Sequence, residues 1–239
     1  MTNKSLFKRA FRFKESACTV ISDKLEGIEI AKSSIQNNRK QLETYIKQHQ
    51  QFLFSLEPVE LQEAPEVAIL MAKASLKANV GPMAAVAGVL ADLAVKDMVA
   101  VGCKVAVVEN GGEVYAISNR SIDIGFAAGD EPLSREMGFR LKDFPIGVAT
   151  SSGRFSHAFS FGDADAVTIF GVDAGLADAA ATAVANIVTG DYIQIVIKNA
   201  IDRALKIEGV YGVFILYRGV VGKAGQVPDL IKVTPKKLN

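Results

Sequence analysis

The stretch "GLADAAATAVANIV", residues 175–188, has the composition of a buried helix and contains a single charged residue, Asp178. Its polar side chains Asp178, Thr182 and Asn186 stand at positions i, i+4 and i+8, so they line one face. The remaining positions are Gly, Ala, Val, Leu or Ile, which predicts a helix packed inside the protein. A lone carboxylate on such a helix is costly unless it is paired or binds a cation.

Short apolar segments bounded by Gly, Asp or Pro surround this helix along the chain and predict strands. Helices and strands mix without the regular alternation of a doubly wound fold, so the sequence predicts an α+β protein with helices layered on a mixed or antiparallel sheet. The expected strands are a pair within residues 9–23 at a sheet edge, then 104–109, 121–127, 144–150 and 165–171, and a closing hairpin around Arg218 and Gly219.

Three helices are expected before the middle of the chain. A long amphipathic helix starts at Glu26 with its apolar stripe continuing to Leu53, and a second helix spans residues 66–78. A third starts at Pro82. Its small residues Ala84, Ala87 or Gly88, and Ala91 recur at helical spacing, which permits close packing of another helix or close approach of a flat ligand.

We expect one domain over residues 1–239. Its N-terminal strand pair and long helix cover about residues 1–60, the core with most polar motifs about 65–190, and a C-terminal helix and hairpin about 191–239. A chain of this length with 49% apolar residues can bury a core of its own.

Charge and cysteine content exclude several classes of protein. The 27 basic and 26 acidic residues nearly cancel, which argues against a nucleic-acid binder that works by neutralising phosphates. Cys18 and Cys103 are too few for a disulfide framework or a metal quartet, so a reducing, cytoplasmic location is expected. The longest uncharged apolar stretch, residues 78–91, is too short to span a bilayer, and no membrane partner is expected.

Two polar loops follow expected strands. In "ENGGE", residues 109–113, the paired glycines allow positive φ and close approach of a phosphate or a flat ring, although Asn-Gly is equally typical of an ordinary hairpin turn. In "ATSSG", residues 149–153, backbone amides and the hydroxyls of Thr150, Ser151 and Ser152 suit phosphate oxygens.

Charged groups follow the second loop. Arg154 would add positive charge for an anionic ligand, and His157 is the candidate proton donor or acceptor, with hydrogen bonding to the ligand as its alternative role. No acid stands at a spacing that would complete a Ser-His-Asp triad. Asp178 and Thr182 form a hard-oxygen pair suited to Mg²⁺, and the alternative is a hydrogen bond from the helix to a loop.

Together, "VGPMAAVAG", "ENGGEVY", "ATSSGRFSHAFSFGDADAVTIFG" and "LADAAATAVAN" resemble the ApbE-like superfamily, known for enzymes that move FMN from FAD onto a protein threonine. The resemblance covers about residues 65–190. It is stronger to a branch of small proteins from methanogens and anaerobic bacteria whose biochemical activity is not established. Its match to the transferases implies that Asp178 and Thr182 bind Mg²⁺, that Asn110, Gly111 and Gly112 line the flavin nucleotide pocket, and that Ser151, Ser152 and Gly153 form the TSG turn with one extra serine.

Two positions depart from the transferase pattern. Val86-Ala87-Gly88 stands where the transferases have Ala-Lys-Gly, and their His-Ile-Ile-Asp-Pro loop is absent after His157. The resemblance therefore implies a cleft for a nucleotide-like or other anionic ligand, with Mg²⁺, in an accessory role in anaerobic sulfide assimilation and homocysteine synthesis. FAD-dependent FMN transfer or flavin-nucleotide hydrolysis is the first alternative.

A non-catalytic partner protein with a vestigial pocket is the second alternative. A homodimer is expected, and a protein partner in sulfur assimilation would fit the accessory role. The ligand-binding residues predicted are Asn110, Gly111, Gly112, Glu113, Thr150, Ser151, Ser152, Gly153 and Arg154.

Overall fold

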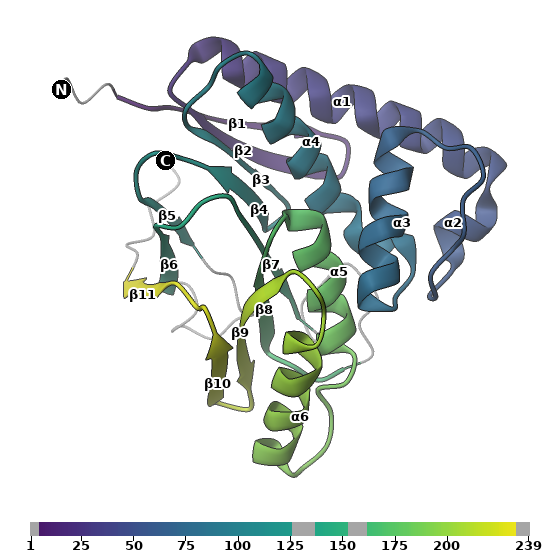
Figure 1. The fold of residues 1–239 in the computed structure, drawn as a ribbon, viewed down its shortest axis with the longest axis vertical. Helices are drawn as coiled ribbons and strands as arrows, with labels where there is room; N and C mark the ends of the chain where they lie inside the picture. The colour runs from purple at the N-terminus through teal and green to yellow at the C-terminus, as the bar shows by residue number, and fades with distance from the viewer. Residues whose placement is uncertain (1–4, 126–136, 153–161, 233–239) are drawn as a thin grey trace.

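An eight-stranded sheet runs through the computed structural model, which describes residues 5–125, 137–152 and 162–232 (Figure 1). Its strand order is β1-β2-β3-β4-β7-β8-β9-β10, and neighbouring strands are antiparallel throughout. The strands are β1 (Phe7–Phe13), β2 (Ser16–Ser22), β3 (Ala106–Asn110), β4 (Glu113–Ile117), β7 (Ile146–Ser151), β8 (Ala166–Gly171), β9 (Val210–Tyr217) and β10 (Val220–Gly225).

Helices cover one face of this sheet, and a second sheet of three strands covers part of the other (Figure 1). The small sheet has the order β11-β6-β5, with β11 (Asp229–Lys232), β6 (Met137–Leu141) and β5 (Ile122–Gly125). The helices are α1 (Leu25–Gln48), α2 (Gln50–Phe54), α3 (Glu66–Ala78), the 3₁₀ turn η1 (Pro82–Ala85), α4 (Val86–Ala100), α5 (Ala174–Ala185) and α6 (Ile193–Leu205).

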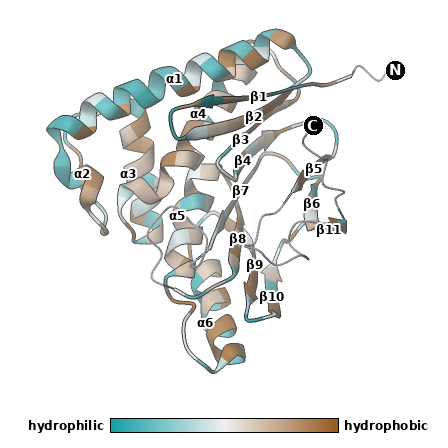
Figure 2. Cartoon of the chain, turned by 180° about the vertical axis from the view of Figure 1, so that it is seen from behind, coloured by the Kyte–Doolittle hydropathy of each residue, from teal (hydrophilic) through white to brown (hydrophobic). Residues whose placement is uncertain are grey.

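Strand β3 shows why the central strands are apolar on both faces. Ala106 and Val108 pack beneath α1 and α4, whereas Val107 packs against the small sheet, where Phe139 is fully buried. Alternate side chains of a strand point to opposite faces, so a sheet covered on both faces needs apolar residues at consecutive positions. Figure 2 shows the corresponding hydropathy, with the hydrophilic side of α1 turned outward and apolar strands inside.

Helix α5 is the buried helix that its sequence predicts. Every residue of α5 is buried except Asp178 and Thr182. Helix α4 crosses it at Gly88, where an added Cβ would fall 2.2 Å from the backbone oxygen of Ala174. The small residues of the third predicted helix therefore serve close helix packing at this point.

Most other predicted elements are confirmed. The N-terminal strand pair lies at the sheet edge, the second helix spans residues 66–78, and the C-terminal hairpin turns at Arg218 and Gly219. The long first helix is interrupted at His49, and the third begins as a 3₁₀ turn. Strands β4, β6 and β11 were not predicted; each has only four or five residues, a length at which periodicity alone is a weak signal.

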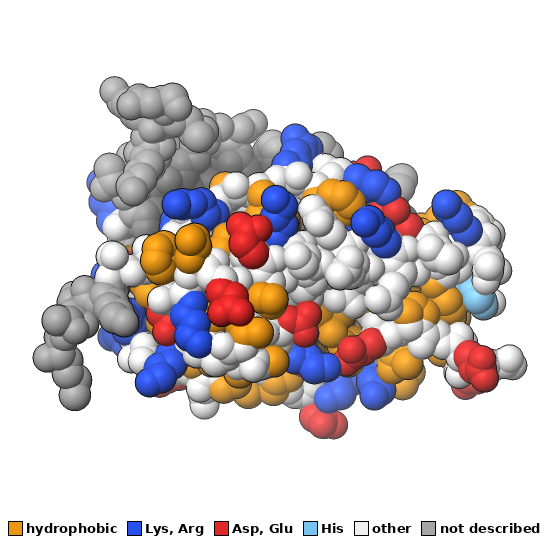
Figure 3. All heavy atoms as spheres, turned by 90° about the horizontal axis from the view of Figure 1, so that it is seen from above, with side chains coloured by type: hydrophobic (Ala, Val, Ile, Leu, Met, Phe, Trp, Pro, Cys, Tyr) orange, Lys and Arg blue, Asp and Glu red, His pale blue; other side chains and the backbone are white. Residues whose placement is uncertain are grey.

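In the described part of the chain, no single helix is long and apolar enough to cross a membrane. Helix α3 and the continuous η1–α4 segment reach the required length and composition only as a pair, bent by 103°. Basic and acidic side chains are interspersed on the face seen in Figure 3, in keeping with the nearly balanced charge of the sequence.

Candidate functional site

Three predicted site residues, Glu113 on β4, Ser151 on β7 and Asp178 on α5, lie on the helix-covered side of the large sheet. Ser151 pairs with Val167, whose side chain belongs to the core beneath the helices. Glu113 is one residue before Val114, which packs on the opposite face, so its side chain points to the helix side. Strands β4 and β7 are antiparallel neighbours, so the start of β4 and the end of β7 meet at one end of the sheet, near α5.

Asp178 is anchored to the start of α4. Its carboxylate Oδ2 accepts a hydrogen bond from the backbone N–H of Gly88 at 3.1 Å. Desolvation raises the pKa of Asp178 well above its ordinary value, and the Glu113 carboxyl raises it further. Among the described residues, the groups that shift this pKa include no positively charged side chain.

Glu113 is the second acid of this site. Burial raises its pKa to about 7, and the neighbouring Glu109 carboxylate adds to the increase. Because the Glu113 carboxyl raises the pKa of Asp178, the two acids favour either a shared proton or a bound cation. We call Asp178, Thr182 and Glu113 the acidic site.

Asn110 connects the β3–β4 turn to the same helix end. Its side-chain Nδ2 donates to the backbone oxygen of Ala87 at 3.0 Å, and its Oδ1 accepts from the Cys18 thiol at 3.3 Å. Asn110 is only 2% exposed, so its amide acts as a brace between β3 and α4.

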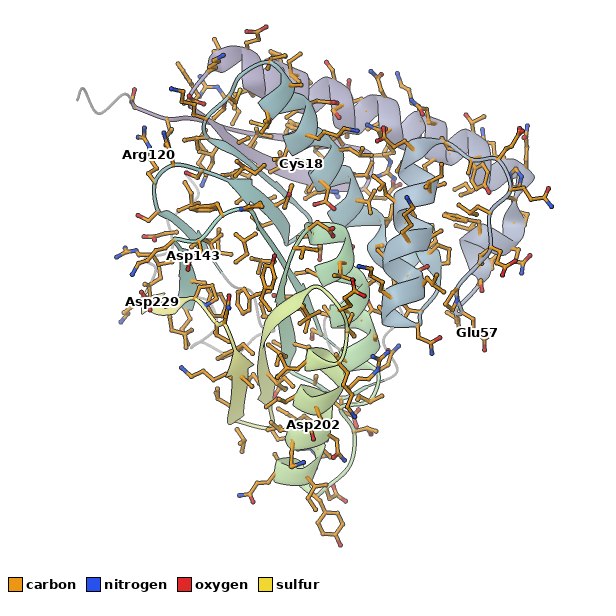
Figure 4. The ribbon with its side chains drawn as sticks, in the orientation of Figure 1. Cys18, Glu57, Arg120, Asp143, Asp202 and Asp229 are labelled. Atoms are coloured by element: carbon orange, nitrogen blue, oxygen red, sulfur yellow. The ribbon has the colours of Figure 1, made fainter. Side chains whose placement is uncertain are left out.

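Both cysteines are buried, as expected of inert core residues. Cys18 lies beneath α1 and α4 (Figure 4). Burial, reinforced by the Glu109 charge, raises the pKa of its thiol to about 12, which suppresses the thiolate at neutral pH.

The glycine pair forms a tight, exposed turn between β3 and β4. Gly111 and Gly112 have φ of 73° and 117°, backbone angles that residues other than glycine rarely adopt. The Gly111 N–H donates to the oxygen of Ala17, and the Gly112 N–H donates to Glu109 Oε1 at 3.0 Å. The turn is therefore a hairpin turn, and a ligand that reached it would have to compete for these amides.

The structure separates the hydroxyls of the second polar loop. Thr150 bonds Thr168 through their hydroxyls at 2.9 Å, on the sheet face away from Asp178. Ser151 faces the helices, and Ser152 is buried with 8% exposure. Gly153, Arg154 and His157 lie outside the described residues. The described part of the chain thus brings Ser151 to the side of the acidic site and leaves Thr150 apart.

Asp92 extends the row of acids along the contact between α4 and α5, and sequence reasoning missed it. Its two carboxylate oxygens accept the backbone N–H groups of Ala174 and Gly175, each at 2.8 Å. Burial raises its pKa to about 8, with a further contribution from Asp173. The available signal was an acid four residues after Gly88, in the apolar first half of the third predicted helix.

The acidic site suits a hard cation with few protein ligands. No group of three or more His, Cys, Asp or Glu side chains within residues 5–125, 137–152 and 162–232 has the geometry of a metal cluster. Mg²⁺ commonly binds one or two carboxylates and keeps several waters, so a pair of acids with the Thr182 hydroxyl fits it better than Zn²⁺ or Ca²⁺.

Comparison with known proteins identifies the family. The family model described as AbpE bacteria matches residues 15–207. The chain belongs to this family. A UPF0280 protein of Methanococcus vannielii is 38% identical over 237 residues, covering 97% of this chain and 96% of that protein. A UPF0280 protein of Methanosarcina acetivorans is 40% identical over 232 residues, covering 94% and 89%.

Two solved structures have a fold similar to that of this AbpE family member. The apo flavinyl transferase ApbE of Pseudomonas stutzeri matches with a TM-score of 0.59 at 15% identity, covering 92% of this chain and 94% of that one. The ApbE protein of Thermotoga maritima also gives 0.59 at 15% identity, covering 92% and 97%. The predicted ApbE-like resemblance and the α+β fold class are both confirmed.

Proposed function

We propose that the acidic site binds a nucleotide-like ligand together with Mg²⁺, with a flavin nucleotide as the leading ligand class. The observation that carries the proposal is the Asp178 carboxylate, aimed from a buried helix at the backbone of Gly88 beside Glu113. The flavinyl transferase of matching fold supports the ligand class.

Each group has a definite task in this proposal. Asp178 and Thr182 hold the cation, which would neutralise the phosphate charge of the ligand when bound. Glu113 supplies a second carboxylate, directly or through a water. Ser151 contributes a hydroxyl to the phosphate side of the ligand, and Asn110 keeps the β3–β4 turn in place against α4.

Calorimetric titration of the purified protein with FAD, FMN and ADP, each with and without Mg²⁺, tests the proposal. The Asp178→Asn variant keeps an oxygen for the Gly88 N–H but removes the charge, and should weaken Mg²⁺-dependent binding at least about tenfold. Asp202→Asn is the matched control, because Asp202 lies on α6 and pairs with Lys198 at the surface. Equal affinities for the two variants and the wild type would contradict the metal role of Asp178.

A catalytic role is the second candidate, favoured by the similarity to flavinyl transferases. In this reaction the oxygen of a water or a threonine hydroxyl attacks the FMN phosphorus of FAD and gives up its proton to the solvent. The bond from that phosphorus to the bridging oxygen breaks, and AMP leaves with the bridging oxygen. Chromatography after incubation with FAD and Mg²⁺ would detect AMP. Binding of FAD without release of AMP would support a role as a binding protein and would contradict the catalytic role.

The accessory role in sulfide assimilation and homocysteine synthesis belongs to this proposal as its cellular setting, with a cytoplasmic homodimer as the working form. Light scattering after size-exclusion chromatography measures the oligomeric state. Co-purification of a sulfur-assimilation enzyme in the absence of any nucleotide binding would instead support the non-catalytic partner protein.

A further inference from the structure

A cavity of about 600 Å³ lies between α3, α4 and the start of α5. None of the acidic-site residues lines it. Its wall is mainly apolar, formed by Leu70, Ala74, Val89, Leu93 and Leu176. We call it the α3–α4 cavity.

Three lysines stand at the rim of the α3–α4 cavity. Lys73 and Lys77 are one turn apart on α3, and Lys96 lies on α4; all three are exposed. Lys73 has no ion-pair partner in the described part of the chain. Lys77 and Lys96 pair with the exposed acids Glu208 and Glu66, and exposed pairs of this kind are easily exchanged for another anion.

The inner end of the cavity holds two acids, Asp92 and Asp173, whose carboxylates already accept hydrogen bonds. Asp92 accepts two backbone N–H groups of α5, and Asp173 accepts that of Leu176 as the N-cap. The positive end of the α5 dipole faces the same two carboxylates. These acids need no cation from a ligand. Because they already accept the N–H groups of Ala174, Gly175 and Leu176, these amides are not available to an anion deep in the cavity.

We propose that the α3–α4 cavity binds a small amphipathic anion, with an apolar body against the cavity wall and one carboxylate, sulfonate or phosphate group at Lys73 and Lys77. The lysines at the rim and the already bonded amides at the inner end fix this orientation. The Tyr115 hydroxyl, which lies near Asp92 and Asp173, is available to hydrogen-bond the inner end of the ligand.

The first test uses two fluorescent probes, anilinonaphthalene sulfonate and the uncharged N-phenylnaphthylamine. The wild type should bind both saturably at one site. Lys73→Gln/Lys77→Gln should weaken sulfonate binding about fivefold and leave the neutral probe unchanged, since only the sulfonate needs the lysines. The matched control is Lys32→Gln/Lys47→Gln, which replaces two exposed lysines of α1 that do not line the cavity. This variant should leave the affinity for both probes unchanged.

A filling variant tests the cavity itself. Ala74→Phe should abolish binding of both probes, provided that its thermal unfolding stays cooperative; if it does not fold, the charge pair alone decides. Equal effects of the two lysine pairs, or absence of saturable binding to the wild type, would overturn the proposal. Asp178→Asn should leave probe binding intact, so a failure of the nucleotide proposal is distinguishable, whereas loss of probe binding in that variant would place the probe in the acidic site and overturn this inference.

Discussion

The backbone N–H of Gly88 donates to the Asp178 carboxylate at the point where α4 and α5 are in backbone contact. One turn away along the same two helices, Asp92 accepts the N–H groups of Ala174 and Gly175. The contact between α4 and α5 therefore positions Asp178 of the acidic site, and one turn away it caps the N-terminus of α5 through Asp92.

Gly88→Ala should destabilise the protein by about 2–4 kcal/mol, because its Cβ would meet backbone atoms that cannot move independently. Urea unfolding followed by circular dichroism measures the loss. Gly125→Ala is the control, since an added Cβ there meets no atom within 4 Å, and its stability should stay close to that of the wild type. A Gly88 variant as stable as the control would mean that the helices do not approach this closely.

Asp92→Ala should cost about 1–3 kcal/mol, because two N-terminal amides of α5 lose their acceptors. Asp97→Ala, on the same helix and without a side-chain hydrogen bond among the described residues, should change stability by less than about 0.5 kcal/mol. Thermal unfolding at neutral pH compares the two, and a similar loss in both would argue against capping by Asp92.

The ligand-free protein should lose stability as pH rises from about 5 to 8. Burial raises the pKa of Glu113 from 4.5 to about 7 and that of Asp92 from 3.8 to about 8. In this window the native state binds more protons than the unfolded state, so the free energy of unfolding falls with increasing pH. Glu113→Gln should flatten the slope below pH 7, and a slope unchanged in that variant would be the contrary result.

Removing the Thr150 and Ser151 hydroxyls should have different effects. Thr150→Val breaks the bond to Thr168 on the far sheet face, so it should cost about 1 kcal/mol of stability and leave Mg²⁺-dependent nucleotide affinity unchanged. Ser151→Ala should weaken that affinity with little change in stability. Parallel calorimetric and thermal measurements decide, and an affinity loss confined to the Thr150 variant would place the ligand on the other face.

Local patterns predicted a large part of the fold. The apolar composition of residues 175–188 is enough to predict a buried helix with Asp178 and Thr182 as its polar positions, and α5 has these features. Strand β4 was missed because its five residues follow the glycine pair directly and carry Glu113 and Tyr115 on one face. Polar residues next to a glycine pair are typical of a loop. Only the structure shows that these two side chains lie on the helix-covered face of a strand.

By itself, the sequence determined the α+β class, the edge strand pair, the buried α5 helix and the ApbE-like resemblance, because helical spacing, strand composition and motif order are local properties of the chain. Only the tertiary structure decided that Thr150 and Ser151 face opposite ways, that Asp92 caps α5, and that Asn110 braces α4. These relationships join residues far apart in sequence, and they depend on sheet register and on how closely two helices approach, which no local pattern contains.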